Sequence, residues 1–180
     1  MKSASFAFVI AVLAAPAFAA NPDVGGAPML ESKNIIENAV NSADHTTLVA
    51  AVKAAGLVDA LMGAGPFTVF APVNSAFDAL PPGTIETLLR PENKEMLTKI
   101  LTAHVVAGDF TAADIAARAK KSKDGFFNME TLSGDALSAK VKNGKVYVYD
   151  ESGNASLITI ADVDQSNGVI HVINKVLLPK

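Results

Sequence analysis

Three histidines are the residues of this chain with the widest chemical range, because an imidazole can bind a metal ion or transfer a proton near neutral pH. They are His45, His104 and His171, and they lie far apart along the sequence. The chain has no cysteine, no HExxH pair, no GxSxG elbow and no phosphate-binding glycine loop. An enzyme or metalloprotein would therefore require the fold to bring two imidazoles, or one imidazole and a carboxylate, within about 4 Å of a common point.

The sequence around His171 predicts a buried strand. In the segment VIHVI, residues 169–173, every residue except the histidine is apolar. Because alternate side chains of a strand share a face, both faces of this strand are apolar, and we expect it to be central in its sheet. A histidine there should be neutral and hydrogen-bonded, since burying an unsatisfied polar group costs a few kcal/mol. A catalytic or metal-binding role for His171 is the alternative.

The other two histidines stand beside predicted helices. A helix is predicted from Pro91 onward, and His104 falls on its apolar stripe, so His104 should also be buried with a structural role. A catalytic or metal role is again the alternative. His45 precedes a second predicted helix, and we expect its side chain to be exposed to solvent. Three residues could cap that helix: Asp44, Thr46 and Thr47.

Two charged segments could bind ions or partners. The basic segment RAKKSK, residues 118–123, ends a predicted helix that opens where Thr111 and Asp114 resemble a capping box. Cations complement the carbonyl end of a helix, so we interpret this segment as a helix terminus, with a docking patch for an acidic surface polymer as the alternative. Asp162 and Asp164 form a turn without the dense oxygen ligands of a calcium loop, and we interpret it as solvated.

The first 19 residues have the features of a secretory signal peptide: one lysine, an apolar stretch and a small-x-small site at residues 17–19. We therefore expect a secreted or periplasmic protein. Residues 20–32 contain several prolines and glycines without periodicity, which predicts a flexible N-terminal segment, and residues 33–180 should form a single domain. No later segment approaches the roughly 18 apolar residues of a membrane span. Without cysteines, the fold must depend on core packing.

Predicted helices dominate the first two thirds of the domain and strands the last third. Residues 67–71 are an apolar segment typical of a buried strand, and Asn74 or Ser75 is expected to cap the helical turn that follows. The segment LSAKVKNGKVYVYD, residues 137–150, alternates apolar and polar side chains around Asn143-Gly144, which predicts a β-hairpin with a two-residue turn. Helices followed by strands indicate an α+β fold.

Three motifs resemble those of the fasciclin domain. TVFAPVNSAFDALP (residues 68–81) and NGVIHVINKVLLP (residues 167–179) resemble its two conserved boxes, and LTAHVVAG (residues 101–108) is similar to its central tyrosine-histidine motif. Their order and spacing also fit, and the resemblance covers about Lys33 to Lys180. It implies a wedge-shaped β-sandwich of about seven strands with helices packed alongside. It also implies an extracellular module associated with cell adhesion and matrix contact.

The expected function is that of a secreted, non-enzymatic adhesion or interaction module without a cofactor. Its partner would be a protein or polysaccharide of a cell surface or matrix, and self-association is compatible with this role. The net charge of −3 disfavours nucleic acid as a partner. An extracellular binder of a small lipid or glycan is the alternative, which a large apolar pocket would favour.

The resemblance also implies where such a module could make contact. The candidate interaction and framework residues are Ala103, His104, Asn74 and His171. Ala103 stands where the family has a tyrosine. In animal relatives that motif and its surroundings have been linked to integrin binding, so an integrin role is not expected here. Asn174 replaces a common aspartate, which removes a charge but keeps hydrogen-bonding capacity.

Overall fold

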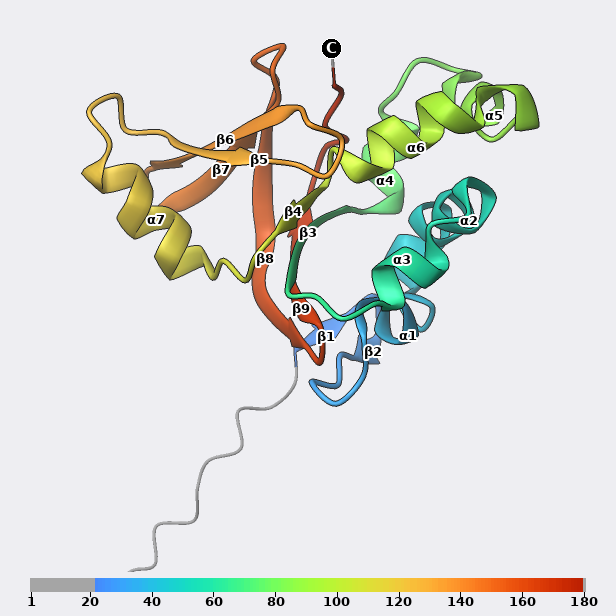
Figure 1. Cartoon of the computed structure of the whole chain (residues 1–180), viewed down its shortest axis with the longest axis horizontal. Helices are drawn as coiled ribbons and strands as arrows, with labels where there is room; N and C mark the ends of the chain where they lie inside the picture. The colour runs from blue at the N-terminus through green and yellow to red at the C-terminus, as the bar shows by residue number, and fades with distance from the viewer. Residues whose placement is uncertain (1–21, 180) are drawn as a thin grey trace, which may run out of the picture.

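The computed structural model describes residues 22–179. Most helices lie together on one side of the molecule, at the right of Figure 1. The helices are α1 (Ile35–Ala39), α2 (Thr46–Ala55), α3 (Val58–Met62), α4 (Asn74–Asp78), α5 (Thr84–Leu88), α6 (Lys94–Thr102) and α7 (Ala112–Lys121), with the 3-10 turns η1 (Ala43–His45) and η2 (Pro91–Asn93). The strands are β1 (Asp23–Val24), β2 (Ala27–Pro28), β3 (Phe67–Pro72), β4 (Val105–Ala107), β5 (Phe127–Glu130), β6 (Ala136–Lys142), β7 (Lys145–Tyr149), β8 (Ala155–Gln165) and β9 (Gly168–Ile173).

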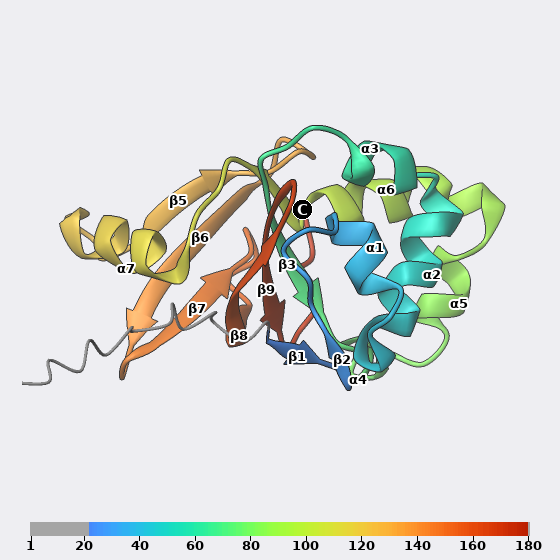
Figure 2. The same cartoon turned by 90° about the horizontal axis from the view of Figure 1, so that it is seen from below.

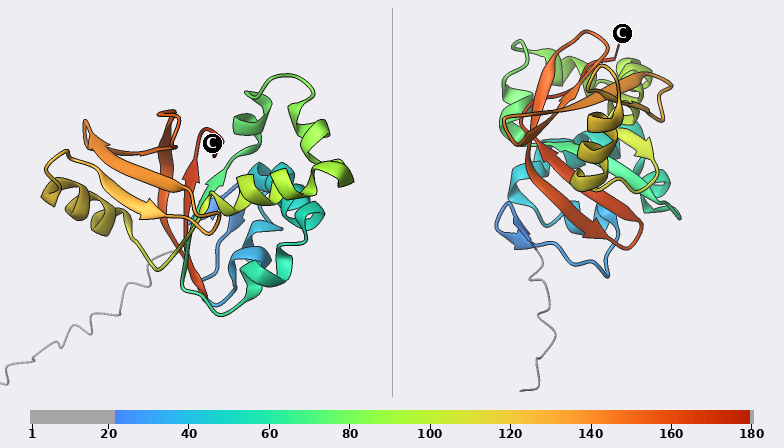
Figure 3. Two further views of the ribbon diagram at one scale, coloured as in Figure 1. Left: turned by 45° about the horizontal axis from the view of Figure 1, so that its top comes forward. Right: turned by 90° about the vertical axis from the view of Figure 1, so that its left-hand side faces the viewer.

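Strands β3 to β9 form one seven-stranded sheet in the order β4–β3–β9–β8–β7–β6–β5. Strands β3 and β9 run parallel, and the other neighbouring pairs of this sheet run antiparallel. Together with α7, strands β5 to β7 diverge from the helical layer on the far side of β3 and β9, which makes the molecule wedge-shaped (Figures 1 and 3). The predicted fold class, α+β with about seven strands and helices packed alongside, is confirmed.

Strand β9 lies between two cores, with the helical layer on one side and β5 to β7 with α7 on the other (Figure 2). Ile170 and Val172 belong to the core formed with α1, α2 and α6. Ile173 belongs to a second core, which also contains residues of β6, β7 and α7. The prediction of a central strand with two buried faces is therefore confirmed, since all five residues from 169 to 173 are buried.

Strand β8 joins the two halves of the sheet because it changes partner along its length. Residues 155–157 pair with β7, whereas residues 158–165 pair with β9. Two register shifts interrupt the second ladder, and Asp162 within it has a φ of 56°. Irregularities of this kind bend a strand and increase its twist. The bend in β8 thus accounts for the angle between the two halves of the wedge.

The predicted β-hairpin is confirmed in its register. Val141 pairs with Val146 and Ala139 with Val148. The turn residue Asn143 has a φ of 52°, which fits the left-handed conformation that the Asn-Gly pair favours. The apolar face of the hairpin packs into the second core, and the lysine face is turned to solvent.

The turn between β8 and β9 is held by Asn167, a residue that the sequence pattern did not single out. Its Nδ2 donates to the carbonyls of Leu61 at 2.8 Å and Gly63 at 3.0 Å. Its Oδ1 accepts from the N–H of Ile35 at 3.1 Å. Its backbone carbonyl accepts from the N–H of Phe67 at 3.1 Å. The side chain of Asn167 therefore joins α1 to the end of α3, and its backbone carbonyl holds the first residue of β3.

Replacing Asn167 with alanine should lower the free energy of unfolding by about 2–4 kcal/mol, because three hydrogen bonds are lost and their partly buried partners are left unpaired. Urea unfolding of the two proteins measures this difference. Asn41→Ala is the matched control: the exposed Asn41 side chain makes one bond, to the Glu37 carbonyl at 2.8 Å, and its loss should cost less than about 0.5 kcal/mol. Equal losses in both variants would contradict the anchoring role of Asn167.

The segment before α1 differs from the flexible lead-in that its composition predicts. Strands β1 and β2 form a hairpin, and the side chains of Val24 and Met29 are buried in the helical core. The buried side chain of Asn38 donates to the carbonyl of Leu30 at 2.8 Å and also donates to the side chain of Gln165. Val24 and Met29 are isolated apolar residues that give no periodicity in the sequence, yet their burial anchors this short segment.

The predicted signal peptide, residues 1–19, lies outside the residues that the structure describes. Within residues 22–179, no helix is both long enough and apolar enough to cross a membrane.

Candidate functional site

His171 is completely buried, and backbone groups engage both of its ring nitrogens. Its Nδ1 accepts from the N–H of Asp162 at 3.2 Å, so Nε2 carries the proton and donates to the carbonyl of Phe110 at 2.8 Å. The ring stacks on Phe70, with centroids 5.6 Å apart. Burial lowers the pKa of His171 below its usual 6.5, although the Phe110 carbonyl and nearby aspartates act in the opposite direction. The expected burial and hydrogen bonding of this imidazole are confirmed, and the lowered pKa favours its neutral form.

His104 has the same arrangement at the end of α6. Its side chain is 3 % exposed. Its Nε2 accepts from the N–H of Leu177 at 2.9 Å, so Nδ1 carries the proton and donates to the carbonyl of Ile100 at 2.8 Å. Burial lowers the pKa of His104 to about 4, against the opposing influence of the Ile100 carbonyl and the Asp150 charge. The imidazole thus links α6 to the C-terminal segment and stays neutral at physiological pH.

His45 is buried, so the prediction of an exposed side chain is wrong. Only 3 % of its surface is exposed. Its Nδ1 pairs with the hydroxyl of Ser42 at 2.9 Å, whereas Nε2 is buried and has no hydrogen-bond partner among residues 22–179. Burial lowers its pKa, although the Ala71 backbone and Asp44 oppose the shift. The helix that follows His45 was predicted correctly. The short N-terminal hairpin that covers this side chain has no periodic pattern in the sequence and was not predicted.

The histidines do not form a common site. Phe70 separates His104 from His171: its N–H donates to the carbonyl of His104 at 2.9 Å, and it lies opposite His171 in the β3–β9 ladder. Among residues 22–179, no group of three or more histidine, aspartate or glutamate side chains could hold a metal ion. The alternative roles in catalysis or metal binding therefore find no geometric support at His104 or His171.

Asn74 caps a helix other than the one expected. Its Oδ1 accepts from the N–H of Thr47 at 3.0 Å, and its Nδ2 donates to the carbonyl of Ala43 at 2.8 Å. It therefore caps α2, whereas Val73 at the start of α4 makes no side-chain cap. The three residues expected to cap α2 locally do not do so, since its N-cap position, His45, has no capping hydrogen bond. The long-range cap joins the first conserved box to the helical layer.

Ala103 is buried at the end of α6. Of the four candidate interaction residues, only Asn74 is partly exposed, and the other three are internal. All four hold elements of the fold together or fill space between them. Direct contact of these residues with a partner stays a prediction. Asn174, in place of the usual aspartate, accepts from the N–H of Leu157 at 2.9 Å, so the charge is not needed for this bond.

Two small cavities lie in the helical layer. The larger, of about 40 Å³, is lined by apolar side chains that include Ile35, Leu48 and Val52. The second, of about 30 Å³, lies beside His45. Sites for small organic ligands usually have volumes of about 300–1,000 Å³. These cavities are far smaller, so they do not favour the alternative of a lipid or glycan binder.

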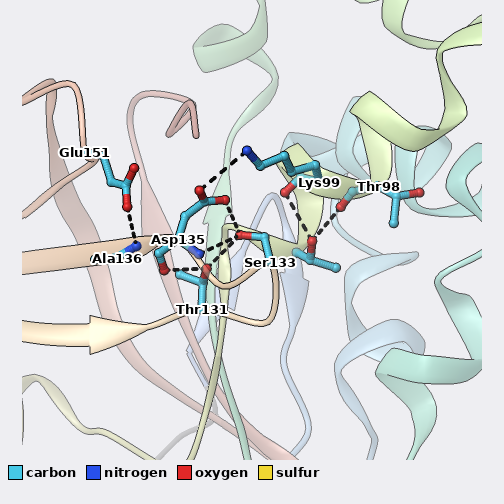
Figure 4. Close-up of polar contacts among 8 residues, drawn as sticks. Thr98, Lys99, Thr131, Ser133, Asp135, Ala136 and Glu151 are labelled. Carbon is cyan, nitrogen blue, oxygen red and sulfur yellow. Dashed lines mark hydrogen bonds and ion pairs between the residues drawn. The ribbon is translucent and has the colours of Figure 1, made fainter. Parts of the chain in front are cut away.

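A polar groove lies open on the surface between α6 and the turn from β5 to β6. We call it the α6 groove; it has a volume of about 640 Å³, and Lys94, Thr98, Thr102 and Ser133 are among its lining residues. At its edge, Lys99 Nζ lies 3.6 Å from Asp135 Oδ1, and the Ser133 hydroxyl donates to Asp135 Oδ2 at 2.6 Å (Figure 4). The ion pair links the β5–β6 turn to α6, and the hydroxyl bond lies within the turn.

Comparison with known proteins gives one consistent result. Residues 43–179 match the fasciclin domain. Protein sll1483 of Synechocystis sp. is 54 % identical over 145 residues, which cover 81 % of this chain and 73 % of that protein. Immunogenic protein MPT70 of Mycobacterium tuberculosis is 34 % identical over 146 residues, covering 78 % of this chain and 66 % of that protein.

Among solved structures, a FAS1 domain pair from the insect cell adhesion molecule fasciclin I has the same fold, with a TM-score of 0.72 at 19 % identity. The match covers 81 % of this chain and 51 % of that one. The family is known in adhesion-related proteins and consists in general of non-enzymatic domains. These sequence matches show that this chain belongs to the fasciclin domain family.

Proposed function

We propose that this protein is a secreted, non-enzymatic interaction module that binds a protein or polysaccharide of a cell surface or matrix. The observation that supports this proposal is that two buried imidazoles use their ring nitrogens for hydrogen bonds within the fold. Both ring nitrogens of His104 and His171 are bound by the backbone, so neither imidazole has a nitrogen available for a substrate or metal ion. Recognition would therefore depend on the outer surface.

On the surface formed by residues 22–179, an open groove lies on each side of the β5–β6 turn. The α6 groove contains Ser133 of this turn, and a second groove contains Leu132 and Gly134. Each has a volume of about 600 Å³ or slightly more and is open to solvent. Since a rigid sheet and helix hold the turn in place, a partner could bind either groove without a large conformational change.

A pull-down tests the proposal. Residues 20–180, immobilised through the N-terminus, should capture a component from the envelope fraction of the producing cell, and excess untagged protein should compete for it. The captured component should be recovered with unchanged mass, because the module does not react with it. The Asn167→Ala variant, unfolded in urea before immobilisation, serves as the control for non-specific adsorption. Absence of competable capture, or a change in the mass of the component, would contradict the proposal.

A further inference from the structure

A second groove lies between the edge strand β5 and the segment that follows β4. We call it the β5 groove; Phe110, Arg118, Phe127 and Leu132 are among its lining residues, and its volume is about 610 Å³. Unlike the α6 groove, it is bordered by the edge of a sheet. Leu132 is 47 % exposed and leaves an apolar surface for a partner at one end of the groove.

Among residues 22–179, the edge strands β4 and β5 are joined at one place, just after the end of β5. An isolated bridge pairs Val106 of β4 with Thr131, next to a hydrogen bond from the N–H of Leu132 to the carbonyl of Val105 at 2.8 Å. Toward Phe127, within the part of the chain that the structure describes, β5 is paired only with β6. The first half of β5 is therefore an unpaired sheet edge beside the groove.

The phase of the β5–β6 ladder determines which backbone groups point outward. The N–H of Thr131 donates to the carbonyl of Asp135 at 3.0 Å, so Thr131 directs its backbone groups toward β6. In an antiparallel pair, residues that bond to the partner alternate with residues that do not. The N–H and carbonyl of Asn128 and the N–H of Glu130 consequently point away from β6, toward the open side, where an added strand could bind them.

Arg118 supplies a cation at the same groove. Its guanidinium carbon lies 5.1 Å from the ring centroid of Phe110 and 5.3 Å from that of Phe127. The two rings contact each other edge to face, with centroids 5.5 Å apart. Neither ion pair found among residues 22–179 involves Arg118. A guanidinium stacked on aromatic rings keeps its N–H groups available at its edge, where a carboxylate can accept two of them.

We propose that the β5 groove binds an extended peptide segment of a partner protein, which adds a strand to β5 and places an aspartate or glutamate carboxylate on Arg118. This inference rests on the proposed function, because it specifies the kind of partner that the interaction module binds. Backbone hydrogen bonds would provide affinity, and Arg118 with the neighbouring apolar surface would provide selectivity.

Glu130 distinguishes this partner from a polyanion. It lies on β5, is exposed and lines the same groove. Its negative charge opposes a uniformly acidic polymer, whereas a peptide with a single carboxylate at Arg118 avoids Glu130. A charged residue on an edge strand also disfavours pairing between two copies of this protein. The groove therefore fits a partner peptide better than an acidic polysaccharide or a second copy.

NMR titration with two synthetic peptides tests the inference. Both have eight alternating threonine and valine residues, with one central residue replaced by aspartate in the first and by asparagine in the second. We expect the aspartate peptide to shift the amide signals of Asn128 and Glu130 and to bind at least about fivefold more tightly than the asparagine peptide. N-methylation of alternate amides in the aspartate peptide should abolish binding, because those amides would pair with β5.

Arg118→Gln should remove the difference between the two peptides. Lys121→Gln, which removes the same charge from the same helix outside the groove, should preserve it. Both side chains are exposed, so both variants should fold. The inference is wrong if the aspartate peptide does not bind at millimolar concentration, if the shifts map to another surface, or if the preference survives in Arg118→Gln. Concentration-dependent dimerisation through β5 without peptide would also overturn it.

The pull-down separates failure of this inference from failure of the proposed function. If Arg118→Gln captures the envelope component as well as the unaltered protein does, the interaction module remains but the β5 groove is not its site. If the unaltered protein captures nothing, the proposed function itself fails. If Arg118→Gln no longer captures the component and Lys121→Gln still captures it, the result would support both the proposed function and the β5 groove as its site.

Discussion

His104→Ala should lower the free energy of unfolding by about 3–5 kcal/mol at pH 7.5. The ring is buried and connects the carbonyl of Ile100 to the N–H of Leu177. Alanine would leave both backbone groups unpaired in a dry interior and would also leave a cavity between α6 and the C-terminal segment. The two costs add because neither group can reach water without local unfolding.

Urea unfolding followed by circular dichroism measures this loss. Met96→Ala is a suitable control, since Met96 lies on the same helix but is exposed, and its replacement should change stability by less than about 0.5 kcal/mol. A loss below about 1 kcal/mol in His104→Ala would show that the imidazole does not bridge these elements.

Acidification from pH 7 to pH 4 should remove about 3 kcal/mol of stability through His104 alone. Its pKa is about 4 in the folded protein and about 6.5 in the unfolded chain. The unfolded state therefore binds more protons between these values, and stability falls as the pH decreases through this window. The contribution is complete above pH 6.5 and is lost near pH 4. Burial also lowers the pKa values of His45 and His171, so their contributions have the same sign.

Urea midpoints at several pH values between 7 and 4 test this prediction. The urea midpoint should decrease less between pH 7 and pH 4 in His104→Ala than in the unaltered protein, because the variant lacks one of the groups that titrate. NMR of the imidazoles provides a direct check: the His104 ring should stay neutral at pH 6, where an exposed histidine is largely protonated, and the pKa of the His171 ring should lie below the usual 6.5. A stability that does not change between pH 7 and pH 5, with both rings titrating freely, would contradict the assigned contacts.

Local patterns in the sequence predicted the local structure well. The Asn143-Gly144 turn fixes the register of its hairpin, and the alternation of side chains fixes which face is buried. The apolar residues on both sides of His171 predicted a central strand. The capping box of Thr111 and Asp114 is present at the start of α7. Each of these signals depends on residues that are neighbours in the chain.

Features that depend on distant residues could not be predicted in this way. Asn74 caps α2, although 27 positions separate it from Thr47, and Asn167 binds residues more than 100 positions away. The burial of His45 depends on a short hairpin with little apolar sequence. The two grooves are formed by elements that only the folded sheet brings together. The family resemblance predicted the fold but did not indicate either groove.

The parallel pairing of β3 with β9 affects how the chain can fold as it is synthesised. Phe67 pairs with Gly168, so nearly the whole domain must leave the ribosome before the centre of the sheet can form. Contacts between residues so distant in sequence also form slowly, because closing a long loop costs entropy. A nascent chain that lacks β9 would leave β3 and β8 without their common neighbour. Stalled or truncated products should consequently be substrates for chaperones and proteases.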